Sequence, residues 1–243
     1  MKISLRNPHN LSTVAYWVCL IALVTLPWRT PEWAVWLPYI AGVYAFGILT
    51  LSVGYHRLFC HSAFRTSKFW QAVFALGGVM FMYGSPIQWS VYHHVHHLRA
   101  DTDGDPHHPS LWALVFKSYK RVPLDAWTTR RLLRQNARLH RFVDKYFLGI
   151  LAAGLALLLV VSPQFVLNAY LPGAALVLLV AGSHTIISHI GGRPRDWWFL
   201  ELVAPAGGDW LHATHHDKPR LWDLRTRWYH IDVGALLIRA IRK

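Results

Sequence analysis

Four long runs without a charged residue place the strongest constraint on how this chain folds. They cover residues 11–28, 33–55, 69–92 and 146–183. A membrane-spanning helix needs about 20 apolar residues, and the last run is long enough for two passes around Ser162-Pro163-Gln164. With 53% hydrophobic and only 15% charged residues among 243, the composition is that of an integral membrane protein.

The distribution of Lys and Arg predicts how the chain is oriented. Between the first two runs the only Lys or Arg is Arg29, and residues 162–171 carry neither. Residues 99–145 and 191–243, in contrast, are rich in both. Positively charged segments stay on the cytoplasmic side. We therefore expect both termini there, in a multi-pass protein of a bacterial inner membrane.

The net charge narrows the class of partner. A formal charge of +13 suits anionic lipid head groups or a phosphorylated substrate. The basic residues border the apolar runs and belong to no recognisable nucleic-acid motif, so no nucleic-acid partner is expected.

Sixteen histidines cluster at the ends of the apolar runs on the predicted cytoplasmic side. His56 and His61 close the second run, and two H-x-x-H-H triplets follow later, at His93, His96, His97 and at His212, His215, His216. Residues at i, i+3 and i+4 share one helical face and can aim their rings at one centre. The i to i+5 step from His56 to His61 fits one face poorly. The helix should therefore end or bend there, or the two rings should serve different metals.

This many imidazoles predicts a pair of metal ions. Neutral imidazole binds Zn, Cu, Fe and Ni, and eight or nine ligands exceed what a single ion uses. The carboxylate-bridged di-iron site of helical bundles needs several Glu, but the chain has only Glu32 and Glu201. Neither triplet contains the Glu of a zinc protease motif.

These arguments predict an all-α integral membrane fold of four transmembrane helices with a cytoplasmic helical cap that carries a histidine-ligated dimetal site. We expect one domain over residues 1–243, with spans at about 11–28, 33–55, 146–162 and 165–188. Residues 69–92 should be interfacial or re-entrant, because a fifth crossing would separate His56 and His61 from His93. The cap would comprise residues 93–145 and 189–243.

The three histidine motifs resemble those of membrane fatty-acid desaturases, in particular the acyl-CoA desaturase branch. Gly54-Tyr55-His56-Arg57-Leu58-Phe59-Cys60-His61 is similar to the first motif, and His93-x-x-His96-His97 followed by Asp101-Thr102-Asp103-Gly104-Asp105-Pro106-His107 to the second. His212-x-x-His215-His216 is similar to the third. The similarity extends in order over most of the chain.

The resemblance implies an oxygen-dependent di-iron fatty-acyl desaturase that introduces a double bond into a saturated acyl chain, with two Fe ions as cofactors and O2 as co-substrate. The substrate would be linked to CoA, a lipid or a carrier protein. Electrons would come from a separate ferredoxin, rubredoxin or cytochrome b5 type donor with its reductase. The implied iron ligands are His56, His61, His93, His96, His97, His189, His212, His215 and His216, and His184 is a bystander.

Residues next to these ligands are candidates for indirect roles. Asp101, Asp105 and Asp209 are candidate acceptors for imidazole N–H groups, because ligating histidines have such partners. Thr185 stands four residues before His189, where the family typically carries an Asn that holds an iron through water. Because of this departure, a fatty-acyl or lipid hydroxylase with the same histidine cage stays open, and a metal-binding membrane transporter or sensor is the second alternative.

Overall fold

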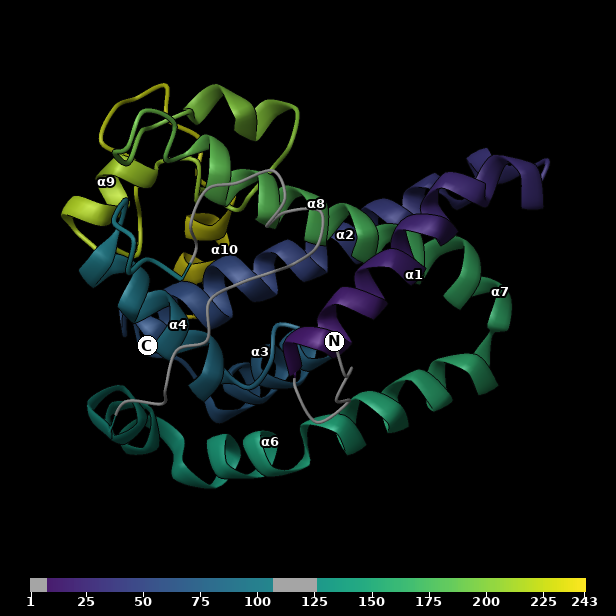
Figure 1. Ribbon diagram of the computed structural model, residues 1–243, viewed down its shortest axis with the longest axis horizontal. Helices are drawn as coiled ribbons and strands as arrows, with labels where there is room; N and C mark the ends of the chain where they lie inside the picture. The colour runs from purple at the N-terminus through teal and green to yellow at the C-terminus, as the bar shows by residue number, and fades with distance from the viewer. Residues whose placement is uncertain (1–7, 107–125) are drawn as a thin grey trace.

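The computed structural model describes residues 8–106 and 126–243, whose secondary structure is helical apart from two isolated β-bridges, as Figure 1 shows. The elements are α1 (Pro8–Arg29), η1 (Trp33–Trp36), α2 (Leu37–Leu49), η2 (Thr50–Cys60), α3 (Lys68–Met80), α4 (Pro86–Arg99), α6 (Ala126–Val161), α7 (Pro163–Phe165), η3 (Val166–Tyr170), α8 (Leu171–Ile187), η4 (Trp198–Leu202), α9 (His212–Asp217) and α10 (Val233–Ile241). The all-α prediction is confirmed for this part of the chain.

Three helical stretches are long and apolar enough to cross a membrane. They are Trp33–Cys60, Ala126–Val161 and Pro163–Ile187, and Thr13–Arg29 forms a shorter apolar helix. After α6 the chain reverses at Ser162, whose side chain accepts a hydrogen bond from the Phe165 N–H, and α8 returns beside α1 and α2 (Figure 1). Val160, at 84% exposure, faces outward. The apolar helices and their exposed side chains associate the protein with a membrane.

The run at 69–92 folds as a helical hairpin. α3 ends at Met80 and α4 begins at Pro86, after a turn in which the Ser85 hydroxyl accepts from the Gln88 N–H. The Tyr83 hydroxyl donates to the Gly47 carbonyl at 3.3 Å, which places the turn beside the middle of the second apolar helix. On α4 the His93 ring returns to within 4.5 Å of the His56 ring. The chain therefore runs along the second apolar helix in α3 and returns in α4 to the end of η2 that carries the histidines.

The second apolar helix widens just before the first histidine motif. Thr50–Cys60 is a π-helix, in which backbone bonds join residues five apart, and the His61 N–H donates to the His56 carbonyl at 3.0 Å. The helix ends at His61, as expected, but the π-turn also brings His56 and His61 to one side. The expectation that i to i+5 spacing fits one face poorly is wrong here, because it assumed α-helical geometry throughout.

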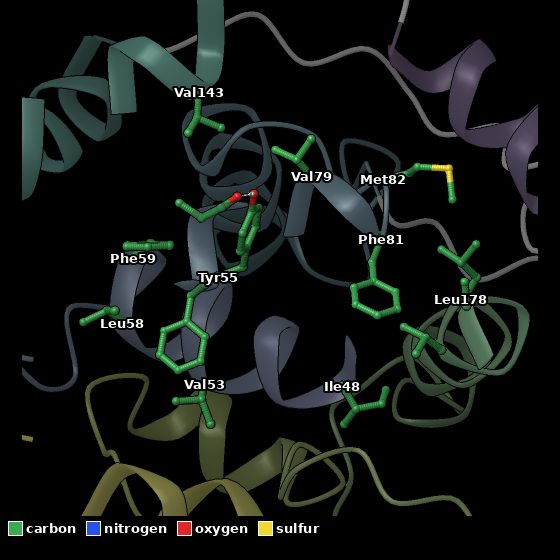
Figure 2. Packing of buried hydrophobic residues seen from close by; sticks show 14 of the residues in the cluster. Ile48, Val53, Tyr55, Leu58, Phe59, Val79, Phe81, Met82, Val143 and Leu178 are labelled. Carbon is green, nitrogen blue, oxygen red and sulfur yellow. Dashed lines mark hydrogen bonds between the residues drawn. The ribbon is translucent and has the colours of Figure 1, made fainter. Parts of the chain in front are cut away.

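A hydrophobic core holds η2 in place. Figure 2 shows part of this cluster, in which Val53, Tyr55 and Phe59 of η2, Val79 of α3 and Val143 of α6 are labelled. The Tyr55 side chain is fully buried, and its hydroxyl lies 3.0 Å from the carbonyls of both Ala75 and Gly84. Because Tyr55 directly precedes His56, this packing also fixes the backbone that presents the first histidine.

A buried arginine ties η2 to the C-terminal part of the chain. The Arg57 Nη1 donates to Asp232 at 2.9 Å and to the Trp222 carbonyl at 3.0 Å, while Nη2 donates to the Gly207 carbonyl at 2.8 Å. Asp232 in turn accepts from the Ala235 N–H and begins α10. Removing one partner of such a pair leaves a buried charge uncompensated, at a cost of about 3–5 kcal/mol.

Gly208→Ala is expected to disrupt this ion pair. Gly208 has φ of +95°, and a Cβ there would meet the Asp232 carboxylate and lie 2.7 Å from the Arg57 Nη2. We expect the free energy of unfolding to fall by about 3–5 kcal/mol, measured by thermal or denaturant unfolding in detergent.

Gly192→Ala is the matched control. Gly192 also has positive φ, +67°, but a Cβ there meets nothing within 4 Å. Only backbone strain of about 1–2 kcal/mol is then expected. Equal destabilisation by the two substitutions would contradict the role given to the Arg57 pair.

Candidate metal centre

The structure gathers nine histidine rings into two adjacent groups. The first contains His56, His61, His93, His97 and His215, and the second contains His96, His189, His212 and His216. Within each group one ligand atom from every residue lies within 4.8 Å of the others. The groups adjoin, because the rings of His97 and His216 stack at 4.2 Å. These are the nine residues that the resemblance implied as ligands.

Each H-x-x-H-H triplet divides its rings between the two groups. On α4, His93 and His97 face the first group and His96 the second. On α9 the assignment is reversed, since His212 and His216 face the second group and His215 the first. The sequence-based expectation that each triplet aims at one centre is therefore corrected. Residues at i and i+4 share a centre, and the residue at i+3 crosses to the other.

The spacing of the ring nitrogens fits a metal at each centre. Five Nε2 to Nε2 distances lie between 2.8 and 3.1 Å, for the pairs His56–His215, His97–His215, His93–His97, His189–His212 and His212–His216. Metal–nitrogen bonds of about 2.0–2.1 Å place neighbouring ligand atoms about 3 Å apart. Converging nitrogen lone pairs repel one another unless a cation lies between them.

Three buried or half-buried carboxylates orient the rings. The Nδ1–H groups of His96 and His189 donate to Asp105 at 2.9 Å and to Asp101 at 3.1 Å. The Nδ1 of His56 lies 3.2 Å from Asp209. A proton held on Nδ1 leaves the Nε2 lone pair free to bind a metal.

Burial keeps the rings in the form that binds metals. It lowers the pKa of His61, His93, His212 and His215 well below the usual range. A buried imidazole loses the hydration that stabilises its protonated form. The neutral rings that metal binding requires are therefore present at neutral pH.

Asp209 connects the centre to the Arg57 pair. Burial raises the pKa of Asp209, but the interactions of its carboxylate with the His56 ring and the Arg57 guanidinium outweigh burial and leave the pKa below its usual range. The Ser52 hydroxyl lies 2.9 Å from the same carboxylate.

Glu201 supports the loop that carries Asp209. Its carboxylate accepts from the N–H groups of Ala206 at 3.0 Å and Gly208 at 2.7 Å. Burial raises the pKa of this carboxyl group to about 7. Sequence reasoning assigned no functional role to Arg57 or Glu201, although each is an ionisable residue in an apolar stretch.

The remaining candidates lie outside both groups. The Thr185 hydroxyl donates to the Ala181 carbonyl of its own helix at 3.1 Å, and the His184 Nε2–H donates to the Asp209 carbonyl at 2.7 Å. His94 stacks on Trp127, and the Cys60 thiol is buried against the Ser90 carbonyl. His107 and His108 lie outside the described residues.

Proteins similar to this chain over most of its length are named desaturases. The chain is 27% identical over 213 residues to an sn-1 stearoyl-lipid 9-desaturase of Anabaena variabilis, covering 81% of this chain and 76% of that protein. It is 26% identical over 252 residues to an icosanoyl-CoA 5-desaturase of Limnanthes douglasii, covering 97% and 70%. With Delta-9 acyl-lipid desaturase 2 of Arabidopsis thaliana it shares 28% over 229 residues, covering 85% and 71%.

These matches over most of the chain support membership of the membrane fatty-acid desaturase family. No protein-family model matches it. Both acyl-lipid and acyl-CoA desaturases are among its relatives, so membership leaves the acyl carrier open. The histidine centre and the apolar helices are the parts of the chain that bear on such an activity, and a metal cofactor fits the histidine groups.

Asp105→Asn is expected to weaken metal binding at the second group. Asn keeps an acceptor for the His96 Nδ1–H but loses the negative charge. Because loss of such a partner typically lowers metal affinity, we expect affinity at the second group to fall by about 10–100-fold. Metal content measured after competition with a chelator tests this. Asp103→Asn, at an exposed position of the same loop, should bind metal like the wild type, and equal losses in both variants would contradict the assignment.

Proposed function

We propose that this protein is an oxygen-dependent fatty-acyl desaturase whose nine histidines hold two iron ions. The observation that carries the proposal is the convergence of two groups made up of imidazoles alone. His56, His61, His93, His97 and His215 would hold one ion, and His96, His189, His212 and His216 the other. Softer thiolate ligands are absent from both groups, which favours a metal that imidazole suits.

The reaction removes two hydrogen atoms from neighbouring methylene carbons of an acyl chain. In balanced form, –CH2–CH2– with O2, two electrons and two protons gives –CH=CH– and two molecules of water. The iron pair and oxygen would supply the oxidising power that no side chain provides. The two electrons per turnover require a donor protein of the ferredoxin, rubredoxin or cytochrome b5 type.

The protein's own contribution is to position and shield this chemistry. The carboxylates of Asp101, Asp105 and Asp209 hold the rings in one tautomer and orientation. Trp89 stacks on the His93 ring at 4.8 Å and contacts the His56 ring at 5.9 Å. The Trp89 side chain would help to keep water from the first group of histidines, and exclusion of water protects a strongly oxidising centre from side reactions.

The proposed topology has four spans, at residues 11–28, 33–55, 146–162 and 165–188, with the 69–92 hairpin re-entrant and a cytoplasmic cap of residues 93–145 and 189–243. Support comes from the hairpin, which returns His93 to His56, and from the Lys and Arg distribution. Both termini would be cytoplasmic in a bacterial inner membrane. Reporter fusions at either end should then give the same cytoplasmic signal, and opposite signals would refute an even number of crossings.

The substrate is a saturated acyl chain linked to CoA, a lipid or a carrier protein. The relatives act on acyl-lipid and acyl-CoA substrates by their names. Thr185 differs from the family residue that holds water near one iron, and its hydroxyl donates within α8. This observation keeps hydroxylation as a second candidate outcome at the same centre.

Expression in a host that makes only saturated fatty acids tests the function. With iron bound and a competent electron donor present, we expect monounsaturated acyl chains, identified by mass spectrometry of the lipids. His215→Ala should abolish the product, because His215 sits in the first group, whereas His94→Ala, a neighbour outside both groups, should retain it.

The same measurement separates the alternatives. A hydroxy acid in place of the alkene would select the hydroxylase. Unchanged lipids from protein with a full complement of iron would contradict both enzymes and favour a metal transporter or sensor.

A further inference from the structure

A loop formed by residues 197–210 lies along the second apolar helix. The Trp197 N–H donates to the Trp210 carbonyl at 2.7 Å and closes the neck of a loop over residues 197–210. Past this neck, the Tyr44 hydroxyl donates to the Pro205 carbonyl at 2.6 Å, and the Ser52 hydroxyl lies 3.0 Å from the Gly207 carbonyl. Tyr44 belongs to the candidate span Trp33–Cys60, so the 197–210 loop reaches the depth of a membrane helix.

Hydrogen bonds within the protein pair much of the polar backbone of this loop. Leu200 and Ala204 donate their N–H groups to the carbonyls of Trp197 and Leu200, both at 2.8 Å. The Ala204 carbonyl accepts from the Trp210 indole at 2.7 Å, and the buried Glu201 carboxylate accepts from the N–H groups of Ala206 and Gly208. Non-helical backbone is stable at membrane depth only when protein groups pair it in this way.

The tip of the loop is apolar and uncovered. Leu202 and Val203 are 68% and 78% exposed, and Phe199 is 45% exposed. The one charged residue between them, Glu201, is turned inward at 3% exposure. Adjacent large apolar side chains with this exposure mark an interaction surface.

We infer that the 197–210 loop inserts into the cytoplasmic leaflet of the membrane, with Phe199, Leu202 and Val203 in contact with lipid acyl chains. Its hydrogen bond to Tyr44 places it beside the lipid-facing surface of a candidate span, so lipid is the occupant continuous with that surface. The same loop carries Asp209 to His56. Lipid contact at the tip and ring orientation at the metal centre therefore depend on one segment. This inference rests on the membrane spans and not on the catalytic activity.

Spin labelling of the full-length protein tests the insertion. Leu202→Cys and Val203→Cys would each carry a nitroxide, with the protein reconstituted into vesicles of phosphatidylcholine and phosphatidylglycerol. Cys19 and Cys60 are buried, and labelled wild type gives their background. Lys218→Cys is the control, because its side chain is 63% exposed at the cap surface. Metal content equal to that of the wild type confirms that each variant is folded.

We expect label mobility and relaxation at residues 202 and 203 to respond several-fold more strongly to oxygen, which partitions into lipid, than to a water-soluble nickel chelate. Residue 218 should show the reverse preference. A water-like response at both tip positions would overturn the inference. Protection from both reagents, with spin–spin broadening that disappears on dilution with unlabelled protein, would also overturn it and identify a second copy of the chain as the occupant.

Discussion

The structure depends on holding nine uncharged imidazoles with their lone pairs directed at two points. Such an arrangement is repulsive without a cation, so the surrounding protein must enforce it. Three carboxylates accept the Nδ1 protons of His56, His96 and His189, and burial keeps the neighbouring rings neutral. The result is a cage without a protein charge on any ligand, which leaves bound metals electron-poor.

The cage is assembled from segments far apart in the chain, and a buried ionic network connects them. Arg57 contacts both Asp209 and Asp232, so η2, the 197–210 loop and the start of α10 share one set of charges. The backbone carbonyl of Asp209 also accepts a hydrogen bond from the His184 ring N–H. A shift of the backbone in any of these segments therefore changes the position of the His56 ring through a chain of two or three hydrogen bonds.

Sequence reasoning succeeded where short-range spacing carries the information. The H-x-x-H-H triplets and their neighbouring Asp residues identified the rings that meet in space and the acceptors beside them. It predicted that the helix ends at His61 but not that a π-turn brings His56 and His61 to one side, because a π-helix cannot be distinguished from an α-helix by residue spacing alone. It also missed Arg57, whose side-chain partners lie at least 150 positions away along the chain. It missed Glu201 as well, whose partners are backbone N–H groups, the nearest five positions away.

Composition and local residue order are enough to predict the apolar helices, the histidine motifs and the resemblance to the desaturases. The division of the rings between the two groups is visible only in the folded chain. His93 and His97 face one centre while His96 faces the other, and α9 divides its rings in the opposite sense. That division depends on the relative rotation of α4 and α9, which contacts between segments far apart in the chain set and which no local pattern encodes.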